Sequence, residues 1–317
     1  MLCLGIESTA HTFAASLVDE RARVLSHERH SFSSDNAGMV PREVALSHRE
    51  NAESVIRGAL VEEPDLIAFS QGPGIGSCLQ VGADYSKAFA GKLKLPRVGV
   101  NHCVAHLEIG RVKTKSSDPV FLYASGANTQ IIAFTEGKYR VFGETLDIGV
   151  GNLLDKFARF LGLGFPGGPK LYEFSRKGKL VPLSYGVKGM DVCFSGLFSQ
   201  AKRAIEKGVS KRDVAFSLQE IAFSELVEVS ERAMAHCGKN ELLLGGGVAA
   251  SDWLKEKCKI MCSERGAKAF FVEPALAVDN AAMIAWQGLL EKDKASKRKA
   301  WRINPGWRTD EVEVDWR

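Results

Sequence analysis

Apolar and polar positions repeat one arrangement in two separate parts of the chain. Residues 2–28 read as an apolar run, a small polar turn, a second apolar run, a charged turn and a third strand. Residues 120–145 follow the same order. Each copy predicts three consecutive strands, and helical patterns follow both copies. The repetition indicates a duplicated α/β fold, although two unrelated three-stranded meanders would also look alike at this level.

The rest of the pattern predicts helices and further strands. Apolar residues that recur every three or four positions predict helices at 43–60, 83–92, 151–162, 195–206, 213–236 and 278–291. Short apolar runs predict strands at 65–70, 96–100 and 241–244. No linker or low-complexity tract interrupts these segments. The mixture of elements is typical of the α/β class.

Composition fits a folded chain with a sizeable core. Of the 317 residues, 45% are hydrophobic and 25% are charged, and this length suits two domains or one bilobal body. The net charge of +4 permits an anionic partner without demanding one, because the distribution of charge decides that. One strong charge run stands at 291–302 (EKDKASKRKAWR). Such a run is usually a solvated helix end or tail. The functional alternative is a segment that contacts phosphates.

Cysteine usage and the amino-terminal sequence bear on the compartment. The seven cysteines form no CxxC pair, which is typical of small buried side chains in a reducing environment. Cys258 and Cys262 stand four apart, so a helix would place both on one face. The first apolar run starts at Leu2 without a basic region or cleavage site, and no apolar stretch approaches the length of a membrane span. These features predict a cytoplasmic protein.

Four glycine-rich segments follow or join predicted elements. They are 72–76 (GPGIG), 125–129 (SGANT), 164–169 (GFPGGP) and 245–247 (GGG). Glycine lets the backbone approach a ligand closely, and consecutive exposed amides can bind an anion. None of the segments matches a Walker A or a Rossmann pattern, and each alone is explained by the needs of a turn. Together with the duplicated unit, they favour a nucleotide held between two lobes.

A histidine pair follows the predicted strand at 96–100. On a helix, His102 and His106 would project from one face and could share a metal ion. The alternative to a metal site is that the two histidines only make hydrogen bonds at a strand-to-helix junction. Cys103 occupies the place of the glutamate that a zinc protease requires, which argues against a metalloprotease. Asp279 and Tyr123 are candidates for further ligands by position, but spacing does not establish them.

A series of motifs in this chain resembles one known family. The motifs are GIESTAHT at 5–12, PRE at 41–43, AFSQGPGIGSCLQVG at 68–82, NHCVAH at 101–106, LYASGANTQ at 122–130, GNLLDKFARFLGL at 151–163, FPGGP at 165–169, LLLGGGVAAS at 242–251 and VDNAAMIAWQG at 278–288. They are similar to those of the universal tRNA threonylcarbamoyladenosine (t6A) transferase family in its archaeal and eukaryotic branch. That branch supplies the catalytic subunit of the KEOPS complex, and older descriptions called the family O-sialoglycoprotein endopeptidases. The resemblance covers nearly the whole chain.

The resemblance implies a fold and a division into domains. The fold is the actin-like, heat-shock-chaperone-like ATPase (ASKHA) fold, built from two duplicated ribonuclease H-like lobes. The first lobe would comprise residues 1–117, completed by a carboxy-terminal segment at about 288–317. The second lobe would comprise residues 118–287 and carry a helical insertion.

The resemblance also implies a metal site and a nucleotide site. One divalent ion, iron or zinc and sometimes magnesium, would be held by His102, His106, Tyr123 and Asp279, and the two histidines and the aspartate would be catalytic. ATP or threonylcarbamoyl-AMP would be contacted by Tyr123, Ala124, Ser125, Gly126, Ala127, Asn128, Asp155, Gly168, Tyr172, Gly246, Gly247 and Ser251.

Three of these positions depart from the family's usual pattern. Ala127 stands where a second glycine is usual, Tyr172 where a glutamate usually contacts the ribose, and Ser251 where an asparagine is usual. The departures concern the sugar and base of the nucleotide and leave the metal set whole.

The implied activity is an acyl transfer onto tRNA. The threonylcarbamoyl group would pass from threonylcarbamoyl-AMP to the N6 amine of adenosine 37, in tRNAs that read codons beginning with A. Residues 292–302 and Arg42 are candidates for phosphate contact, and no residue declares itself a general base. Implied partners are tRNA and the KEOPS subunits, including a small atypical protein kinase/ATPase and a dimerising small subunit. The alternative is an ATP-binding kinase, an ATPase or a nucleotide-binding scaffold of the same superfold.

Overall fold

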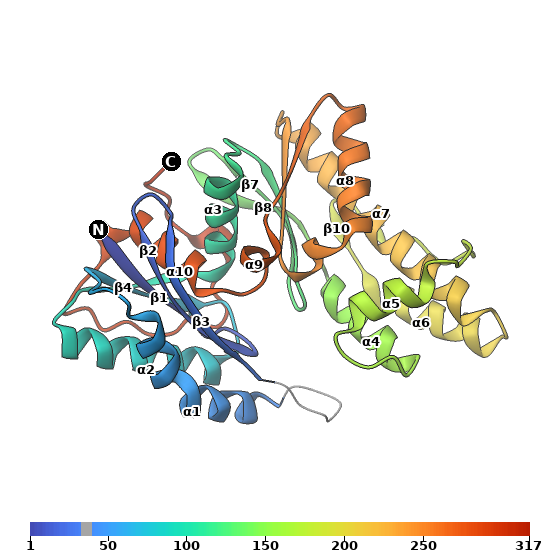
Figure 1. The fold of residues 1–317 in the computed structure, drawn as a ribbon. Coiled ribbons are helices and arrows are strands. Elements are labelled where there is room, and N and C mark those ends of the chain that lie inside the picture. Colours follow the sequence, from blue (N-terminus) through green and yellow to red (C-terminus); the bar gives the residue numbers. More distant parts are fainter. Residues whose placement is uncertain (33–39) are drawn as a thin grey trace. The chain divides into compact units, whose positions relative to one another are not determined.

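The computed structural model describes residues 1–32 and 40–317, which form two compact units (Figure 1). The first unit comprises residues 1–113 and 279–317, and the second comprises residues 114–278. The second boundary lies at 278/279, nine residues before the 287/288 expected from the family resemblance. The reason is that α10 (Ala281–Leu290) packs against the first unit's sheet.

A five-stranded sheet forms the centre of the first unit. Its strands are β1 (Leu2–Glu7), β2 (Thr12–Asp19), β3 (Val24–Ser31), β4 (Leu66–Gly72) and β5 (Arg97–Asn101). Their order is β3-β2-β1-β4-β5. Strands β1, β2 and β3 pair antiparallel, whereas β4 and β5 continue the sheet in parallel. All eight residues of β2 are buried, while β3 at the edge is largely exposed, as expected for central and edge positions of a covered sheet.

Helices cover both faces of this first sheet (Figure 1). Leu4 and Ile6 of β1 pack in one hydrophobic cluster with α1 (Pro41–Ala59) and α2 (Gly76–Leu93). Gly5 points to the opposite face, where a Cβ atom would lie 2.2 Å from the Ala281 carbonyl oxygen of α10. The alternation along β1 therefore separates two helical layers, and α10 approaches the strand through the missing side chain.

The second unit repeats the same sheet. Its strands are β6 (Val120–Ala124), β7 (Thr129–Thr135), β8 (Lys138–Glu144), β11 (Glu241–Gly245) and β12 (Lys268–Phe271). Their order, β12-β11-β6-β7-β8, again joins an antiparallel three-stranded meander to two parallel strands. The corresponding orders in the two units confirm the duplicated α/β fold that the apolar pattern predicted.

Helices and a small hairpin complete the second unit. The helices are α4 (Val150–Phe160), α5 (Gly167–Ser175), α6 (Phe194–Glu206), α7 (Lys211–His236), α8 (Asp252–Glu264) and α9 (Pro274–Ala277). The hairpin is formed by β9 (Val187–Lys188) and β10 (Asp191–Val192). A single hydrophobic cluster joins α4, α7 and α8 to β6, β7 and β11. Cys258 and Cys262 are both buried on α8, as their spacing predicted.

Helix α8 (Asp252–Glu264) was not among the predicted helices, and glycine explains two further differences from them. Helix α2 begins at Gly76 rather than at residue 83, because the last glycine of segment 72–76 and the following Gly82 are part of the helix. A Cβ atom on Gly82 would lie 2.2 Å from the Ser8 hydroxyl, so the glycine permits close contact with the end of β1. Helix α5 was missed because it begins within the glycine-rich segment 164–169. Across residues 1–32 and 40–317, no helix combines the length and apolarity needed to cross a bilayer.

Candidate metal centre and nucleotide-binding turns

The histidine pair stands on α3 (His102–Thr114), immediately after β5. Asn101 caps this helix, since its side-chain oxygen accepts hydrogen bonds from the amides of Cys103 (3.0 Å) and Val104 (3.1 Å). The cap starts the helix at His102, and the next turn presents His106 on the same face. The two imidazole rings lie edge to face, with centroids 4.7 Å apart.

Asp279 reaches the histidines from the residue pair that precedes α10. Asn280 caps α10 by accepting a hydrogen bond from the Met283 amide (2.9 Å). The close packing of α10 on Gly5 holds this helix start against β1. Asp279 is therefore placed by a cap and by a close helix–strand contact, although it is far from the histidines in sequence.

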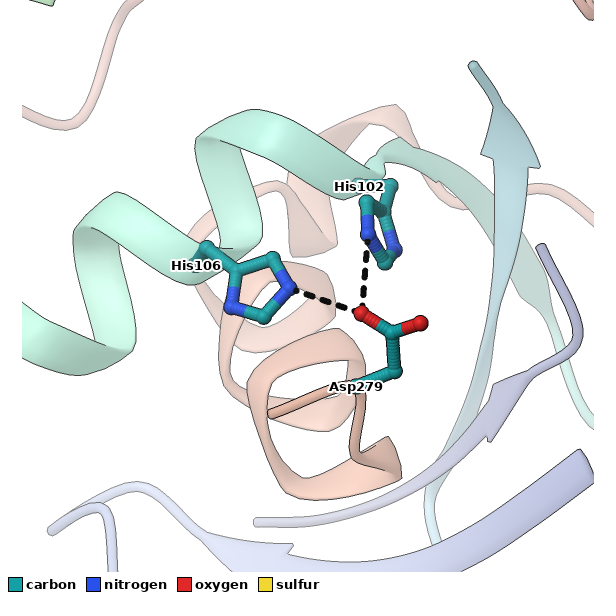
Figure 2. A group of neighbouring side chains, drawn as sticks. All are labelled: His102, His106 and Asp279. Carbon is teal, nitrogen blue, oxygen red and sulfur yellow. Dashed lines mark hydrogen bonds and ion pairs between the residues drawn. The ribbon is translucent and has the colours of Figure 1, made fainter. Parts of the chain in front are cut away.

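Three ligand atoms converge at this point (Figure 2). Asp279 Oδ1 lies 3.5 Å from His102 Nε2 and 3.3 Å from His106 Nε2. One ligand atom from each residue lies within 4.8 Å of the other two. Both imidazoles are buried, while the Asp279 side chain is 22% exposed. The cluster thus combines two nitrogen donors, one oxygen donor and access to solvent.

The electrostatics of the cluster favour an ionised carboxylate. Burial alone would raise the pKa of Asp279, but its hydrogen bonds to both imidazoles hold the pKa well below its usual range. Burial likewise would lower the pKa of His102, yet the carboxylates of Glu7 and Asp279 hold it well above its usual value. Burial lowers the pKa of His106, which favours a neutral ring. His106 and Asp279 are therefore in the protonation states that a metal ion requires of its ligands, whereas His102 would release a proton when an ion binds.

Glu7 is a buried neighbour of this cluster that sequence reasoning missed. Its Oε2 atom lies 3.0 Å from His102 Nδ1, and the residue is fully buried at the end of β1. The available signal was an acidic residue that ends the apolar run LCLGIE, since a buried charge in a strand requires a partner.

The three converging residues suit a transition metal better than magnesium. Imidazole nitrogens favour iron and zinc, whereas magnesium takes oxygen ligands. Two histidines and one carboxylate occupy only part of a coordination sphere, which leaves room for another protein ligand or a substrate atom. Tyr123, the fourth residue predicted, lies on β6 in the second unit, where its ring stacks on Phe121 with centroids 5.8 Å apart.

Most of the predicted nucleotide contacts gather at the ends of two adjacent strands. Strands β6 and β11 pair in parallel, with Gly245 opposite Tyr123. Their following turns therefore meet at one edge of the second sheet. Gly246 has a φ of 93°, and a Cβ atom there would lie 2.4 Å from the Ala124 carbonyl oxygen. Glycine is required at this contact on both conformational and steric grounds.

Some backbone amides of the 125–129 turn donate hydrogen bonds within the turn itself, and others do not. The Ser125 amide donates to the Asn128 carbonyl (2.9 Å), and the Asn128 amide donates to the Ser125 hydroxyl (3.1 Å). Within the described part of the chain, the amides of Gly126 and Ala127 have no recorded acceptor. The first amides of α4 donate to the turn's carbonyls, from Gly151 to Ser125 and from Asn152 to Gly126. Gly126 and Ala127 are therefore the two residues of the turn whose amides remain for a phosphate.

Asp155, Gly168 and Tyr172 lie along α4 and α5. Asp155 Oδ1 accepts the Gly167 amide at 2.8 Å and so fixes the start of α5. Gly168 is the second residue of that helix. Tyr172 is 38% exposed, and its ring is tilted against Trp253 at a centroid distance of 6.2 Å. The structure thus gives Asp155 a structural role beside the ribose contact implied by the resemblance.

Ser251 and the first glycine-rich segment have partners within the chain. The Ser251 hydroxyl caps α8 by accepting the Leu254 amide at 3.4 Å. At Gly72, a Cβ atom would lie 1.8 Å from the Asn304 carbonyl oxygen. The Gly74 amide donates to the Pro305 carbonyl at 3.2 Å. Segment 72–76 therefore packs against the chain's own carboxy-terminal segment, and its glycines permit this close contact. Its contact with a nucleotide stays a prediction.

Solved structures of other proteins share this fold. HypF from T. kodakarensis matches 92% of this chain and 48% of its own length, with a TM-score of 0.66 at 16% identity. An activator of 2-hydroxyisocaproyl-CoA dehydratase from Clostridium difficile, solved with bound ADPNP, matches 93% of this chain and 97% of its own length, with a TM-score of 0.53 at 11% identity. These likenesses place the chain in the actin-like ATPase fold that the motifs implied.

Sequence relatives are far closer. A tRNA N6-adenosine threonylcarbamoyltransferase from Archaeoglobus fulgidus is 48% identical, with complete coverage of both chains. A probable bifunctional tRNA threonylcarbamoyladenosine biosynthesis protein from Methanocorpusculum labreanum is 50% identical over 99% of this chain, which spans 60% of that protein's length. The family model described as tRNA N6-adenosine threonylcarbamoyltransferase matches residues 23–286. The chain belongs to the tRNA N6-adenosine threonylcarbamoyltransferase family.

Proposed function

We propose that this chain transfers the threonylcarbamoyl group from threonylcarbamoyl-AMP to the N6 amine of adenosine 37, in tRNAs that read codons beginning with A. Membership of the family and full-length relatives at about half identity support the transferase activity. The observation that carries the proposal is the convergence of His102, His106 and Asp279, which a kinase or ATPase of this fold would not need.

A divalent metal ion at this cluster is part of the proposal. His102 Nε2, His106 Nε2 and Asp279 Oδ1 would hold it, and the Tyr123 phenol would complete the protein ligands. Iron or zinc fits these donors better than magnesium. When bound, the ion would supply Lewis-acid polarisation of the substrate's oxygen atoms and a fixed point for their orientation.

The second unit would hold the adenylate. The amides of Gly126 and Ala127 would donate to the phosphate as AMP leaves, and Asp155 would contact the ribose hydroxyls. Backbone amides aimed at a leaving phosphate stabilise the negative charge that develops there. The turn at 245–247 would lie beside the nucleotide, because it adjoins the 125–129 turn at the sheet edge.

The remaining chemistry is largely orientation. An exocyclic adenine amine is a poor nucleophile, so a fixed approach to the carbamoyl carbon would supply much of the acceleration. We assign no general base. An anticodon-loop adenosine suits the reaction, because unpaired loop bases can be turned out of the stack.

Contacts with tRNA phosphates are proposed for the basic segment 292–302 and for Arg42. Lys297, Arg298 and Lys299 line a cavity of about 540 Å³, together with Lys87 of α2 and Lys94, which follows that helix. The clustered positive charge supports binding of a polyanionic backbone. Its salt dependence is measurable, since each lost phosphate contact reduces the slope of log affinity against log salt by about one.

Partner proteins belong to the proposal as well. The bifunctional relatives extend well beyond the region that this chain matches, which supports a second protein domain acting with the transferase. We assign this role to KEOPS subunits, among them a small atypical kinase/ATPase and a dimerising small subunit. The cytoplasmic location stays a prediction from the sequence.

Reconstitution tests the proposed activity. Purified chain would be incubated with tRNA, threonylcarbamoyl-AMP and candidate partner subunits, and the nucleosides would be analysed by mass. We expect threonylcarbamoyladenosine to form only when this chain is present. ATP binding or hydrolysis without any nucleoside product, with every partner supplied, would instead indicate an ATPase or a nucleotide-binding scaffold.

A further inference from the structure

Glu7 is a fully buried carboxylate that neither the predicted ligand set nor the proposed reaction uses. It is the last residue of β1, and its Oε2 atom lies 3.0 Å from His102 Nδ1. That nitrogen is on the other side of the imidazole ring from Nε2, which faces Asp279 at 3.5 Å. The ring is thus held between two carboxylates, each on its own nitrogen.

Glu7 is itself held rigidly. Its Oε1 atom accepts a hydrogen bond from the Thr9 amide at 2.6 Å and a second one from the Thr9 hydroxyl. The Thr9 carbonyl in turn accepts the Ile75 amide at 2.8 Å, which ties the turn after β1 to the start of α2. The amide of Ser8 donates to the Ser70 hydroxyl of β4 at 3.0 Å. The carboxylate is therefore fixed by the sheet rather than by a mobile loop.

A carboxylate at Nδ1 decides which ring nitrogen carries the proton. An ionised carboxylate is an acceptor only, so it requires Nδ1 to be the donor. With the proton on Nδ1, a neutral imidazole keeps its lone pair on Nε2. In known metal sites, a carboxylate in this position fixes the tautomer and the ring orientation and makes the ligating nitrogen more basic.

We propose that Glu7 is a positioning residue, which holds His102 with its proton on Nδ1 so that Nε2 is presented to the metal ion. The inference rests on the metal site proposed above. Thr9 supports Glu7 by donating to the other carboxylate oxygen, and the Thr9 hydroxyl also lies 3.4 Å from His102 Nδ1. A purely structural alternative is that Glu7 and His102 form a buried ion pair that only stabilises the fold, and this alternative predicts unchanged metal affinity in any variant that still folds.

Metal affinity of folded variants separates the two explanations. We would prepare Glu7→Ala, Glu7→Gln and Thr9→Val and titrate each metal-free protein with Zn²⁺ and, separately, with Co²⁺. The control is Glu108→Gln, because Glu108 is another buried carboxylate, carried by α3 itself, and it accepts hydrogen bonds from Arg111 and Trp316. Circular dichroism and thermal melting would establish folding, and visible absorption of bound Co²⁺ would report its ligand geometry.

We expect Glu7→Ala to weaken Zn²⁺ binding by about 10- to 100-fold, as loss of such outer partners does elsewhere. Glu7→Gln should weaken it less, because the amide oxygen can still accept the hydrogen bond from Nδ1–H. Some loss should remain, since this single oxygen cannot also serve the Thr9 amide. The Co²⁺ absorption should change in both variants, whereas Glu108→Gln should match the unaltered protein.

Each outcome has a distinct meaning. Folded Glu7→Ala with Zn²⁺ affinity within about twofold of the unaltered protein would overturn the positioning role, given the 10- to 100-fold loss expected. If both Glu7 variants fail to fold, Thr9→Val decides. Because the Thr9 hydroxyl contacts both Glu7 and His102 Nδ1, an altered Co²⁺ spectrum supports the positioning of the ring by this pair, and an unaltered one contradicts it. Failure of the unaltered protein to bind Zn²⁺ or Co²⁺ would instead remove the metal site itself.

Discussion

The two units carry their candidate chemistry in different ways. In the first unit, side chains form the candidate site: two imidazoles on α3 and the Asp279 carboxylate bring three ligand atoms within 4.8 Å of one another. In the second unit, most of the candidate nucleotide contacts come from the backbone of the turns that follow β6 and β11. The sheets are duplicates, yet one presents a compact polar centre and the other a glycine-lined edge.

The difference shows how one duplicated scaffold can serve two ligands. A metal ion needs a few donor atoms of the right element, which side chains supply at helix starts such as that of α3. A nucleotide phosphate needs amides and close approach, which glycine turns supply. Substitutions that separate metal binding from nucleotide binding test this difference between the units. Three of them follow in order of decreasing expected effect, and a fourth substitution, with the smallest expected effect, tests the pH dependence of stability.

Loss of both imidazoles should have the largest effect. His102→Ala combined with His106→Ala removes both nitrogen donors, so metal content and tRNA modification should fall together, the latter by more than about 1000-fold if the ion stabilises the transition state. Metal analysis and nucleoside mass spectrometry measure the two quantities. His48→Gln is the matched control, since His48 is a buried histidine of the same unit whose Nε2 contacts the Ala10 carbonyl. Retained tRNA modification in the metal-free double variant would show that the reaction does not depend on an ion at this cluster.

Gly246→Ala should have the next largest effect, and on the second unit alone. The added Cβ atom would lie 2.4 Å from the Ala124 carbonyl oxygen at a φ of 93°. We expect adenylate affinity to drop about tenfold or more, while metal content stays unchanged, because the turn must shift. Gly266→Ala controls for backbone strain alone, since Gly266 has a φ of 66° and open space around it. Equal loss of affinity in both variants would refute the close-contact explanation.

Asp155→Ala should have an intermediate effect. The substitution removes the proposed ribose contact and releases the Gly167 amide, so adenylate binding should weaken by roughly 0.5–1.5 kcal/mol, the net contribution of a typical hydrogen bond. Isothermal titration with a non-hydrolysable adenylate analogue measures this loss. Metal content should be unaffected, and loss of the ion instead would contradict the separation of the two sites.

Glu225 should give the smallest effect, and it contrasts with Asp279. Burial raises the pKa of Glu225 to about 7, and neighbouring Glu228 and Asp147 add to the rise. The native state keeps this proton to higher pH than the unfolded chain does, so the free energy of unfolding should fall as pH rises from about 4.5 to about 7. Denaturant unfolding of Glu225→Gln should lack this part of the pH dependence. Identical pH profiles for the variant and the unaltered protein would show that Glu225 ionises normally.

The same contrast explains what the sequence could predict. The apolar alternation of the two meanders and the i, i+4 histidines are local patterns, and the fold preserves them. Asp279 joins the histidines from 173 residues away along the chain, and the family resemblance rather than local spacing indicated its place in the cluster. The role of Glu7 depends on which strand end faces α3, and the use of segment 72–76 depends on where the carboxy-terminal segment returns. Both are long-range contacts. Turn amides such as those of Gly126 and Ala127 leave no trace in residue type, because every residue has a backbone.

One titration tests the central claim that His102, His106 and Asp279 hold a metal ion on which tRNA modification depends. Metal-free protein, reconstituted with its partners, tRNA and threonylcarbamoyl-AMP, would receive increasing Fe²⁺ or Zn²⁺ while bound metal and threonylcarbamoyladenosine are measured in the same samples. We expect the formation of threonylcarbamoyladenosine to rise in step with metal binding and to level off at one ion per chain. Full product formation before any metal is added would contradict it.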